Sequence, residues 1–346
     1  MRIVEPGVEL VEQEPGIEGV YKMIEVAGRT CYKSESNEKS TPKDFVDRMI
    51  KSNHGAMLEH GTMYFDVPLG SPIDDGDYML KSTIIQFFKK NKYSVVNKYN
   101  KTYNIEGVSL SMAHYAITTN YRVFTEQFDW DDFGEIRETK EGWKLGMTKE
   151  YMLKYFCDVP NEHHQKRISF RIITDRGVSA EGNRHSVNSI AEQSTRYCNY
   201  SKDKFGNEIS ILDNEDVDID EYNNRLDAVS EFAENRGKTP FQELCFEIYE
   251  HGDGEDVFDA LDIWMFTNMA CEWGDMNLLK RKQTPQQARR VLPLDLQTEV
   301  VYTAFETDWE HFLDLRYRGT TGKPHPDMYV VAKEINDLLI DSKKEK

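Results

Sequence analysis

The densest run of polar side chains is Arg-His-Ser-Val-Asn-Ser-Ile-Ala-Glu-Gln-Ser-Thr-Arg-Tyr, residues 184–197. If its latter part is helical, Ser189, Glu192 and Arg196 share one face. An exposed helix stabilised by a Glu192–Arg196 pair would leave the Ser and His residues and the scarcity of apolar positions unexplained. A site for a phosphorylated heterocycle would use them directly. Arg donates in pairs to phosphate, Ser adds a hydroxyl, and Glu accepts from a sugar hydroxyl or a ring N–H.

Charge is distributed unevenly along the chain. Lys and Arg number 43 and Asp and Glu 61, which gives a net charge of −18. Residues 165–202 carry a net +4 and residues 276–291 a net +5, so the remainder carries −27. A strongly acidic surface repels a polyanion, which argues against a general nucleic-acid binder. The two basic islands indicate a small anionic ligand, unless they are ordinary solvated faces.

Length and composition limit the class of protein. A chain of 346 residues suffices for about two domains, or for one domain with a large insertion. It is 39% hydrophobic, enough for a sizeable core, and its apolar stretches are too short to span a bilayer. The five Cys residues are scattered without a C-x-x-C pair, and no signal peptide is visible. We therefore expect a cytoplasmic protein without disulfides or membrane contact.

Helices and strands alternate irregularly along the sequence. The helical spacing of Val20, Met23, Ile24 and Ala27 predicts a helix over 17–33. Further helices are predicted from Thr41-Pro42 onward and over 223–236, 255–273, 283–290, 307–316 and 326–340, and strands over 62–67, 116–124, 167–173 and 298–305. There is no regular βαβ period and no glycine-rich phosphate loop. We expect an α+β fold in which a mixed or antiparallel sheet packs with helices.

The pattern of residues 184–197 resembles the signature of the flavin-dependent thymidylate synthases, R-H-R-x-x-S-x-N-E-x-S-x-R-Y. Seven positions agree in one register: Arg184, His185, Ser189, Glu192, Ser194, Arg196 and Tyr197. The departures are Ser186 where the family has Arg, Ala191 where it usually has Asn, His311 where Asn is common, and Glu181 where Gln is common. Most residues expected to bind the nucleotide agree with the family signature, whereas several residues expected on the flavin side differ from it. This asymmetry indicates an altered flavin pocket or altered one-carbon chemistry.

Segments on both sides support the resemblance. Residues 175–180 are similar to the family's S-R-A-x-x stretch, and residues 54–60 to its H-x-x-x-x-E-H ahead of a strand. Residues 288–293 are similar to A-R-x-V-L-P, and residues 312–316 to F-L-x-L-R. The likeness covers roughly 17–67, 167–201 and 283–335. We expect a single domain over 1–346 with a core like that of the thymidylate synthase-complementing proteins, and an inserted region of unknown role at 68–165.

The resemblance implies a reaction and its cofactors. The family methylates carbon 5 of dUMP to give dTMP. Methylenetetrahydrofolate would supply the one-carbon unit, FAD would carry the hydride, and NADPH would reduce the flavin. A homotetramer with sites between subunits is implied as well. A relative that hydroxymethylates a pyrimidine nucleotide is the alternative among enzymes.

The resemblance also assigns roles to individual residues. The nucleotide would be held by Arg184, Glu192, Ser194, Arg196, Arg289 and Arg316. The flavin side would comprise His54, His60, His185, Ser186, Ser189, Glu192 and His311. Arg316 would face the uracil and polarise it, favouring attack at carbon 5. Ser194 is the candidate for an activated hydroxyl, although no His or Asp partner lies at a recognisable spacing.

Two interpretations compete with this one. His54, Glu59 and His60 could bind zinc, but a six-residue separation does not place both His on one helical face, so we expect no metal. Residues 87–103 interleave five Lys with five aromatic residues, which suits single-stranded nucleic acid. The same stretch could form a half-buried hairpin with a solvated Lys face. The acidic net charge favours the hairpin, and a non-enzymatic nucleic-acid-binding protein stays the second class of function.

Overall fold

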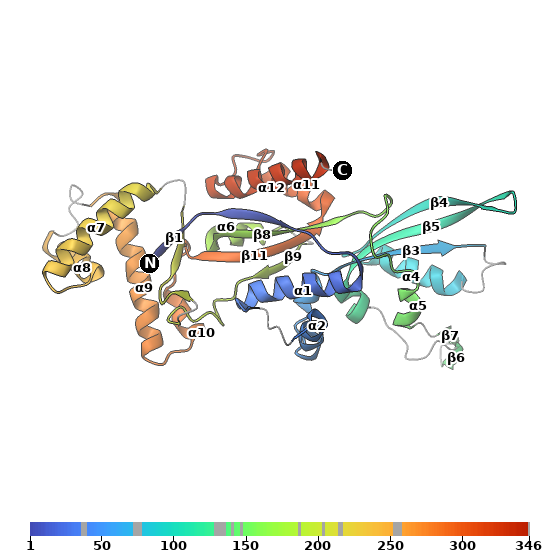
Figure 1. The fold of residues 1–346 in the computed structure, drawn as a ribbon, viewed down its shortest axis with the longest axis horizontal. Coiled ribbons are helices and arrows are strands. Elements are labelled where there is room, and N and C mark those ends of the chain that lie inside the picture. The colour runs from blue at the N-terminus through green and yellow to red at the C-terminus, as the bar shows by residue number, and fades with distance from the viewer. Residues whose placement is uncertain are drawn as a thin grey trace.

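Figure 1 shows an elongated molecule whose parts follow one another along its long axis. A lobe of helices lies at one end, a sheet between helices lies in the middle, and a long hairpin extends at the other end. The computed structural model describes residues 1–35, 40–71, 78–127, 136–139, 142–145, 148–185, 188–202, 205–213, 217–251 and 258–344.

The described residues form both helices and strands. In chain order the elements are β1 (Arg2–Val4), β2 (Gly7–Val11), α1 (Gly16–Tyr32), α2 (Pro42–Lys51), α3 (Gly55–Leu58), β3 (Thr62–Leu69), α4 (Tyr78–Lys90), β4 (Val95–Ile105), β5 (Val108–Asn120), a π-helix (Val123–Gln127), β6 (Ile136–Thr139), β7 (Gly142–Leu145), α5 (Lys149–Leu153), β8 (Arg167–Asp175), α6 (Arg176–Gly182), β9 (Ser189–Glu192), β10 (Ser210–Leu212), α7 (Ile219–Asn235), α8 (Pro240–His251), α9 (Ala260–Lys280), α10 (Pro285–Ala288), a 3-10 helix (Arg289–Val291), β11 (Gln297–Phe305), α11 (Glu306–Arg316) and α12 (Pro326–Lys344).

The central sheet has four strands in the order β2-β8-β11-β9, all antiparallel. The strands predicted over 167–173 and 298–305 are confirmed as β8 and β11. β11 pairs with β8 on one side and with β9 on the other, so Tyr302 lies opposite both Phe170 and Ile190. All nine residues of β11 are buried. This strand is the centre of the fold.

Helices cover both faces of the central sheet (Figure 1). On one face, α11 and α12 bury Phe170 and Tyr302 in an apolar cluster that includes Trp309. On the other face, α1 and α3 pack against the sheet, and Val301 and Ala191 join their core. Successive side chains of a strand point to opposite faces. Each side chain of β8, β9 and β11 therefore belongs to one of two helical layers.

The first two helices agree with the sequence prediction. α1 buries Val20, Met23 and Ile24, as their helical spacing predicts. Before α2, the Thr41 hydroxyl accepts from the Asp44 N–H at 3.2 Å, and the Asp44 carboxylate accepts from the Thr41 N–H at 2.8 Å. This capping box is typical of a helix start and is worth about 1 kcal/mol.

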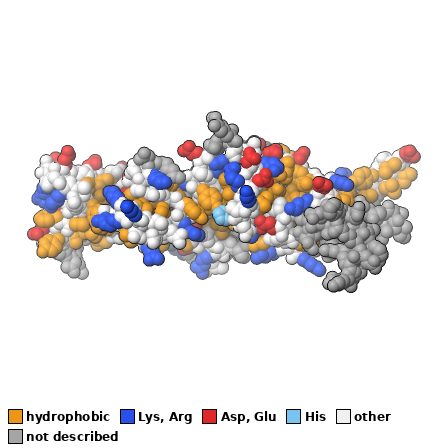
Figure 2. Space-filling model, turned by 90° about the horizontal axis from the view of Figure 1, so that it is seen from below, with side chains coloured by type: hydrophobic (Ala, Val, Ile, Leu, Met, Phe, Trp, Pro, Cys, Tyr) orange, Lys and Arg blue, Asp and Glu red, His pale blue; other side chains and the backbone are white. Residues whose placement is uncertain are grey.

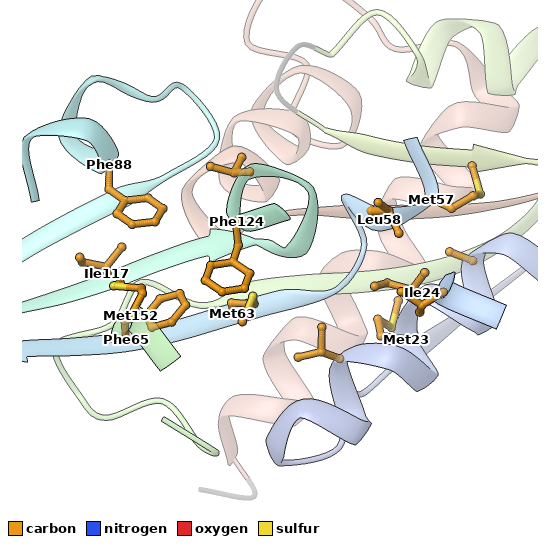
Figure 3. Close-up of a cluster of buried hydrophobic side chains, with 14 of the residues drawn as sticks. Met23, Ile24, Met57, Leu58, Met63, Phe65, Phe88, Ile117, Phe124 and Met152 are labelled. Carbon is orange, nitrogen blue, oxygen red and sulfur yellow. The ribbon is translucent and has the colours of Figure 1, made fainter. Parts of the chain in front are cut away.

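A second antiparallel sheet, β3-β5-β4, carries an aromatic core (Figure 3). Phe65 is fully buried, and its ring centroid lies 6.2 Å from that of Phe88, 5.7 Å from Phe124 and 5.9 Å from Phe156. These rings belong to the same apolar cluster as Ile24 of α1. Residues within 68–165 thus share a core with the N-terminal helices. The outer half of the β4–β5 hairpin extends beyond this core (Figure 1).

The remaining elements complete an α+β architecture. In the lobe, α7, α8 and α9 pack around Tyr222, Leu244 and Met265. β1 pairs with β10 in parallel, whereas the larger sheets are antiparallel, so the expected fold class with a mixed or antiparallel sheet is confirmed. In the part of the chain that the structure describes, no helix is long and apolar enough to cross a membrane.

The helix considered for the latter part of residues 184–197 does not form over residues 189–192, where the chain forms β9. Residues 189–192 pair with β11, and Ala191 lies opposite Val301. Pairing with a buried central strand overrides the local helical spacing, because the sheet satisfies the backbone donors and acceptors of this segment. Ser189 and Glu192, expected on one face with Arg196, therefore point to opposite faces of the sheet.

The strand predicted over 116–124 is too long at its C-terminal end. β5 ends at Asn120, and a π-helix begins at Val123. The Asn120 side-chain oxygen accepts from the Val123 N–H at 2.9 Å, in the manner of a helix cap. Phe124 is buried all the same, but from the helical turn rather than from the strand.

We expect Phe65→Ala to lower the free energy of unfolding by about 3–5 kcal/mol, because it removes a fully buried ring from a packed aromatic core. Urea unfolding followed by circular dichroism measures the change. Val159→Ala is the control, since Val159 is 59% exposed and its loss should change stability by no more than about 0.5 kcal/mol. Equal losses in the two variants would contradict the assignment of this core.

Candidate active site

Arg316, the last residue of α11, is held by two partners near α6. Its Nη1 donates to Glu181 Oε2 at 2.8 Å, and its Nε donates to His185 Nε2 at 3.1 Å. The ring of His311 lies 6.3 Å from that of His185, so three of the predicted site residues are neighbours here. Within the described residues Nη2 of Arg316 has no hydrogen bond. One edge of the guanidinium is therefore available to a ligand.

His185 is uncharged at neutral pH. Burial lowers its pKa to about 4, and the adjacent positive charge of Arg316 acts in the same direction. Because Nε2 accepts the hydrogen bond from Arg316, the single ring proton is assigned to Nδ1. The pair presents one fixed cation and one neutral imidazole.

Glu192 is oriented by three donors that all bind one carboxylate oxygen. Oε1 accepts from Arg176 Nη1 at 2.8 Å, from Ser179 Oγ at 2.9 Å and from Thr298 Oγ1 at 3.2 Å. Arg176 also donates to the Gln193 carbonyl at 2.7 Å, so it fixes side chain and backbone together. Among the described residues nothing binds Oε2, which leaves this oxygen free to accept from a ligand.

Arg176 is a site residue to which the sequence analysis gave no role. Asp175 caps α6 by accepting from the Val178 N–H at 2.6 Å, and Arg176 is then the first helical residue. This position directs its side chain across β11 toward Glu192. An Asp cap followed at once by Arg, shortly before the polar run, was the available signal.

A second group of predicted residues meets at the turn that follows β9. The Ser194 N–H donates to the Cys31 carbonyl at 2.9 Å, which fixes the turn to the end of α1. Arg289 Nη1 donates to Thr195 Oγ1 at 3.1 Å, and the side chains of Arg289 and Arg196 are exposed. Ser194, Arg196 and Arg289 are thus brought together, as expected of residues that bind one ligand.

Aromatic rings line the same turn. The Tyr197 ring centroid lies 5.5 Å from that of Tyr32, which in turn stacks on His54 at 6.0 Å. The Tyr32 hydroxyl is hydrogen-bonded to His54 Nδ1. His54 is exposed and Tyr197 is 52% exposed, so the rings can contact a flat ligand.

Two arginines of the polar run are exposed and unpaired. The guanidinium groups of Arg184 and Arg196 make no hydrogen bond or ion pair with any residue that the structure describes, although Arg196 lies over the Tyr197 ring at 5.7 Å. A free planar guanidinium suits a phosphate, which it can bind with two parallel hydrogen bonds. Ser186, predicted on the flavin side, lies outside the described residues.

His60 and Ser189 lie inside the protein. Both are fully buried. His60 Nδ1 is hydrogen-bonded to Thr303 Oγ1 at 2.9 Å, and Ser189 Oγ accepts from Arg167 Nη2 at 2.8 Å. Burial lowers the pKa of His60 to about 3, with the Arg167 charge contributing, so the ring is neutral. In this arrangement both side chains link β9 and β11 to α3.

The three residues considered for zinc have separate partners. His54 contacts Tyr32, His60 contacts Thr303, and Glu59 Oε1 accepts from Arg122 at 2.6 Å. Within the described ranges, no group of three or more His, Cys, Asp or Glu side chains is placed to hold a metal ion.

A cavity of about 850 Å³ opens beside the end of α1. Its cationic lining residues are paired with acidic side chains: Glu299 accepts from Lys33 and from Arg171, each at 2.7 Å, and Arg29 binds Glu25 at 2.5 Å. None of the predicted site residues lines it. Because its cations are already neutralised, this cavity is a poor phosphate site.

The stretch Phe87–Tyr103 comprises the end of α4 and most of β4, so the expected hairpin is present as β4–β5, whereas the helical turn at its start was not predicted. Tyr99 donates to Asp66 Oδ2 at 2.7 Å and stacks on His163 at 3.8 Å. The Tyr103 hydroxyl is hydrogen-bonded to His114 Nε2 at 2.7 Å. Rings that could stack on bases are thus engaged within the chain, while the lysines are exposed.

Comparison with known proteins gives one family and several distant folds. The thymidylate synthase complementing protein family matches residues 120–341. Among solved structures, the chain is similar to the UMP/dUMP methylase PolB from Streptomyces cacaoi bound with 5-Br UMP, with 11% identity, a TM-score of 0.38, and 99% of this chain and 92% of that chain covered. It is also similar to thymidylate synthase X from Helicobacter pylori with FAD and dUMP, with 19% identity, a TM-score of 0.31, and coverage of 49% and 66%. No curated protein matches.

The family match contains all the C-terminal stretches that carried the resemblance, including the polar run of residues 184–197, Ala288–Pro293 and Phe312–Arg316. It begins at Asn120, the last residue of β5, and covers well over half of the chain. The chain belongs to the thymidylate synthase complementing protein family.

Proposed function

We propose that this protein methylates dUMP at carbon 5 to give dTMP, with methylenetetrahydrofolate as the one-carbon donor. The observation that carries the proposal is the polar run of residues 184–197, which lies inside the family match and supplies oriented groups with unused hydrogen-bonding atoms. FAD and NADPH enter as the hydride carrier and its reductant. The five cysteines are free thiols, which suits a reducing cytoplasm.

The nucleotide is held by groups that the structure leaves available. Oε2 of Glu192 accepts from a sugar hydroxyl or a ring N–H, and Arg184, Arg196 and Arg289 bind the phosphate with Ser194 beside them. Nη2 of Arg316 donates to a uracil carbonyl and stabilises the negative charge that develops there during attack by carbon 5. Glu181 and His185 already fix the Arg316 guanidinium, so little reorganisation is needed.

The residues present fit a flavin in two respects. The half-buried ring of Tyr32 and the exposed rings of His54 and Tyr197 suit a flat heterocycle. His185 and His311 add neutral or exposed imidazoles beside Arg316. When bound, the flavin supplies the hydride chemistry that no side chain can provide. His60 and Ser189 support this side from within, and a role for Ser186 stays a prediction.

The candidate site residues form two groups, called half-sites, on opposite faces of the central sheet. This division favours an active site assembled from more than one subunit. The Arg316 group lies with α6 and α11, whereas the Tyr32–His54–Tyr197 rings lie at the end of α1, which covers the opposite face of the sheet. We infer a homotetramer in which one subunit's Arg316 group faces another subunit's ring group. We also infer one domain over 1–346, with 68–165 as an inserted region that shares its core.

The purified protein tests the proposal directly. We expect the visible absorption bands of an oxidised flavin after titration with FAD, and conversion of dUMP to dTMP in the presence of methylenetetrahydrofolate and NADPH. Product mass distinguishes methylation from hydroxymethylation. A protein that binds no flavin, or that leaves dUMP unchanged in the complete mixture, would overturn the proposal.

We expect Arg316→Lys to bind dUMP almost normally but to lose turnover by about 10²–10³-fold. A Lys point charge cannot keep Glu181 and His185 and also present a planar donor edge, and one preorganised donor is worth about 3 kcal/mol in the barrier. Steady-state kcat and a dUMP titration measure the two effects. Arg318→Lys is the matched control, because Arg318 binds Asp314 and Glu310 on the outer side of the same helix. Unchanged kcat in Arg316→Lys would remove Arg316 from catalysis.

We expect Ser194→Ala to weaken dUMP binding about 10- to 100-fold while retaining measurable kcat. The hydroxyl oxygen accepts from the Arg196 N–H at 3.3 Å, and no described side chain is bonded to it as a general base. A hydrogen bond to a charged phosphate is worth about 1.5–3 kcal/mol. Ser201→Ala, in the following loop, is the control. If kcat vanished while the dissociation constant stayed the same, Ser194 would be the nucleophile instead.

A further inference from the structure

The outer half of the β4–β5 hairpin, residues 99–114, is an amphipathic ribbon, called the arm below. Its register pairs Ile105 with Val108, Tyr103 with Leu110 and Lys101 with Met112, so their side chains share one face. The opposite face is polar, formed by residues 100, 102, 104, 109 and 111. Ile105, Val108, Leu110 and Met112 are 56%, 59%, 52% and 37% exposed. No other described residue covers this apolar face.

An uncovered apolar face is unusual for such a ribbon. A two-stranded hairpin is marginally stable by itself in water, and alternation of apolar and polar residues is the pattern of a sheet with one buried face. The arm extends from the end of the molecule (Figure 1), so its own body does not reach the outer residues. The apolar face of the arm is therefore suited to another molecule.

The part of the chain that carries the arm is basic, although the arm itself holds only one Lys, Lys101, and one Glu, Glu106. Residues 78–127 hold seven basic residues against two acidic ones, in a chain with a net charge of −18. Five of these lysines, at positions 89, 90, 92, 98 and 101, are exposed. The positive charge at the base of the arm favours an acidic partner surface over a second copy of the same basic region.

An acidic surface with exposed aromatic residues lies at the opposite end of the chain. Phe232, Phe246 and Tyr249 of α7 and α8, the lobe surface below, are 60%, 40% and 83% exposed. Residues 218–251 carry nine acidic residues against three basic ones. Arg236 and Lys238 lie over the Phe246 ring, but both are paired with Glu243. Figure 2 shows hydrophobic side chains at both ends of the molecule.

We propose that the arm of one copy docks through its apolar face on the lobe surface of a second copy. The two surfaces match in apolar character, and the segments that carry them, residues 78–127 and 218–251, are opposite in net charge. Because they lie at opposite ends of an elongated chain, two copies placed antiparallel about a two-fold axis make the contact twice. This contact extends the self-association inferred above, and its test needs no enzymatic activity.

Sedimentation velocity of the full chain at about 1–50 μM tests the apolar face of the arm. We expect the wild type to form dimers or multiples of dimers, and Leu110→Asp to raise the dissociation constant by about tenfold or more. Ser111→Asp adds the same charge to the polar face of the arm and should change nothing. Circular dichroism verifies that both variants fold. A monomeric wild type, or equal effects of the two variants, would overturn the proposal.

A mixing experiment tests the partner surface. Tyr249→Asp should weaken association as Leu110→Asp does. An equimolar mixture of the two variants should associate more tightly than either alone, because the intact arm of one copy meets the intact lobe of the other. An arm that pairs with another arm, or with an unrelated protein, would leave Tyr249→Asp unaffected and the mixture no tighter than Tyr249→Asp alone, and either result refutes the arm–lobe contact.

Discussion

Burial of β11 is the constraint on which the other features depend. This strand is enclosed on both faces and on both edges, yet it carries Thr298, Glu299 and Thr303. A buried polar group is costly unless it is hydrogen-bonded. Each of the three meets that requirement through a different partner: Thr298 donates to Glu192, Glu299 accepts from Lys33 and Arg171, and Thr303 binds His60 and Ser169. These bonds tie β9, α1 and α3 to one strand, and they fix the geometry of the candidate site.

The same constraint explains why the polar run serves two half-sites. As a strand beside β11, residues 189–192 send Ser189 toward the Glu59 carbonyl at the end of α3 and Glu192 toward α6. The chain then turns at Ser194, whose N–H is fixed to the end of α1. A helix would have gathered the whole run on one face. The strand divides it between both faces, and the site proposed above would bring the two groups together from different copies of the chain.

Sequence patterns predicted those parts of the fold that depend on local chemistry. The apolar spacing of α1 and the Thr41 cap are local signals, and both are confirmed. The conformation of β9 depends on a partner more than 100 residues away, which no local pattern reveals. For the site, the structure places Glu192 of the polar run and Arg316 of α11 beside α6, and their roles stay predictions. Arg176 escaped notice because its role comes from the position of a helix start relative to β9, a tertiary relationship.

Glu181 gives Arg316 a negatively charged hydrogen-bond partner, which a neutral residue at this position would not. Gln is common at this position in the family that the sequence resembles, and a Gln oxygen could accept the same hydrogen bond without a charge. The carboxylate instead forms an ion pair with Arg316 at 2.8 Å, with the two side chains 31% and 21% exposed. Ionised pairing stabilises the guanidinium in place, but it also compensates part of the positive charge that would otherwise act on a bound pyrimidine. The ion pair with Glu181 thus fixes the orientation of the Arg316 guanidinium but weakens the positive field that this group exerts on a ligand. Under the proposed function, such an exchange favours a ligand that brings its own negative charge close to Nη2, as a developing enolate would.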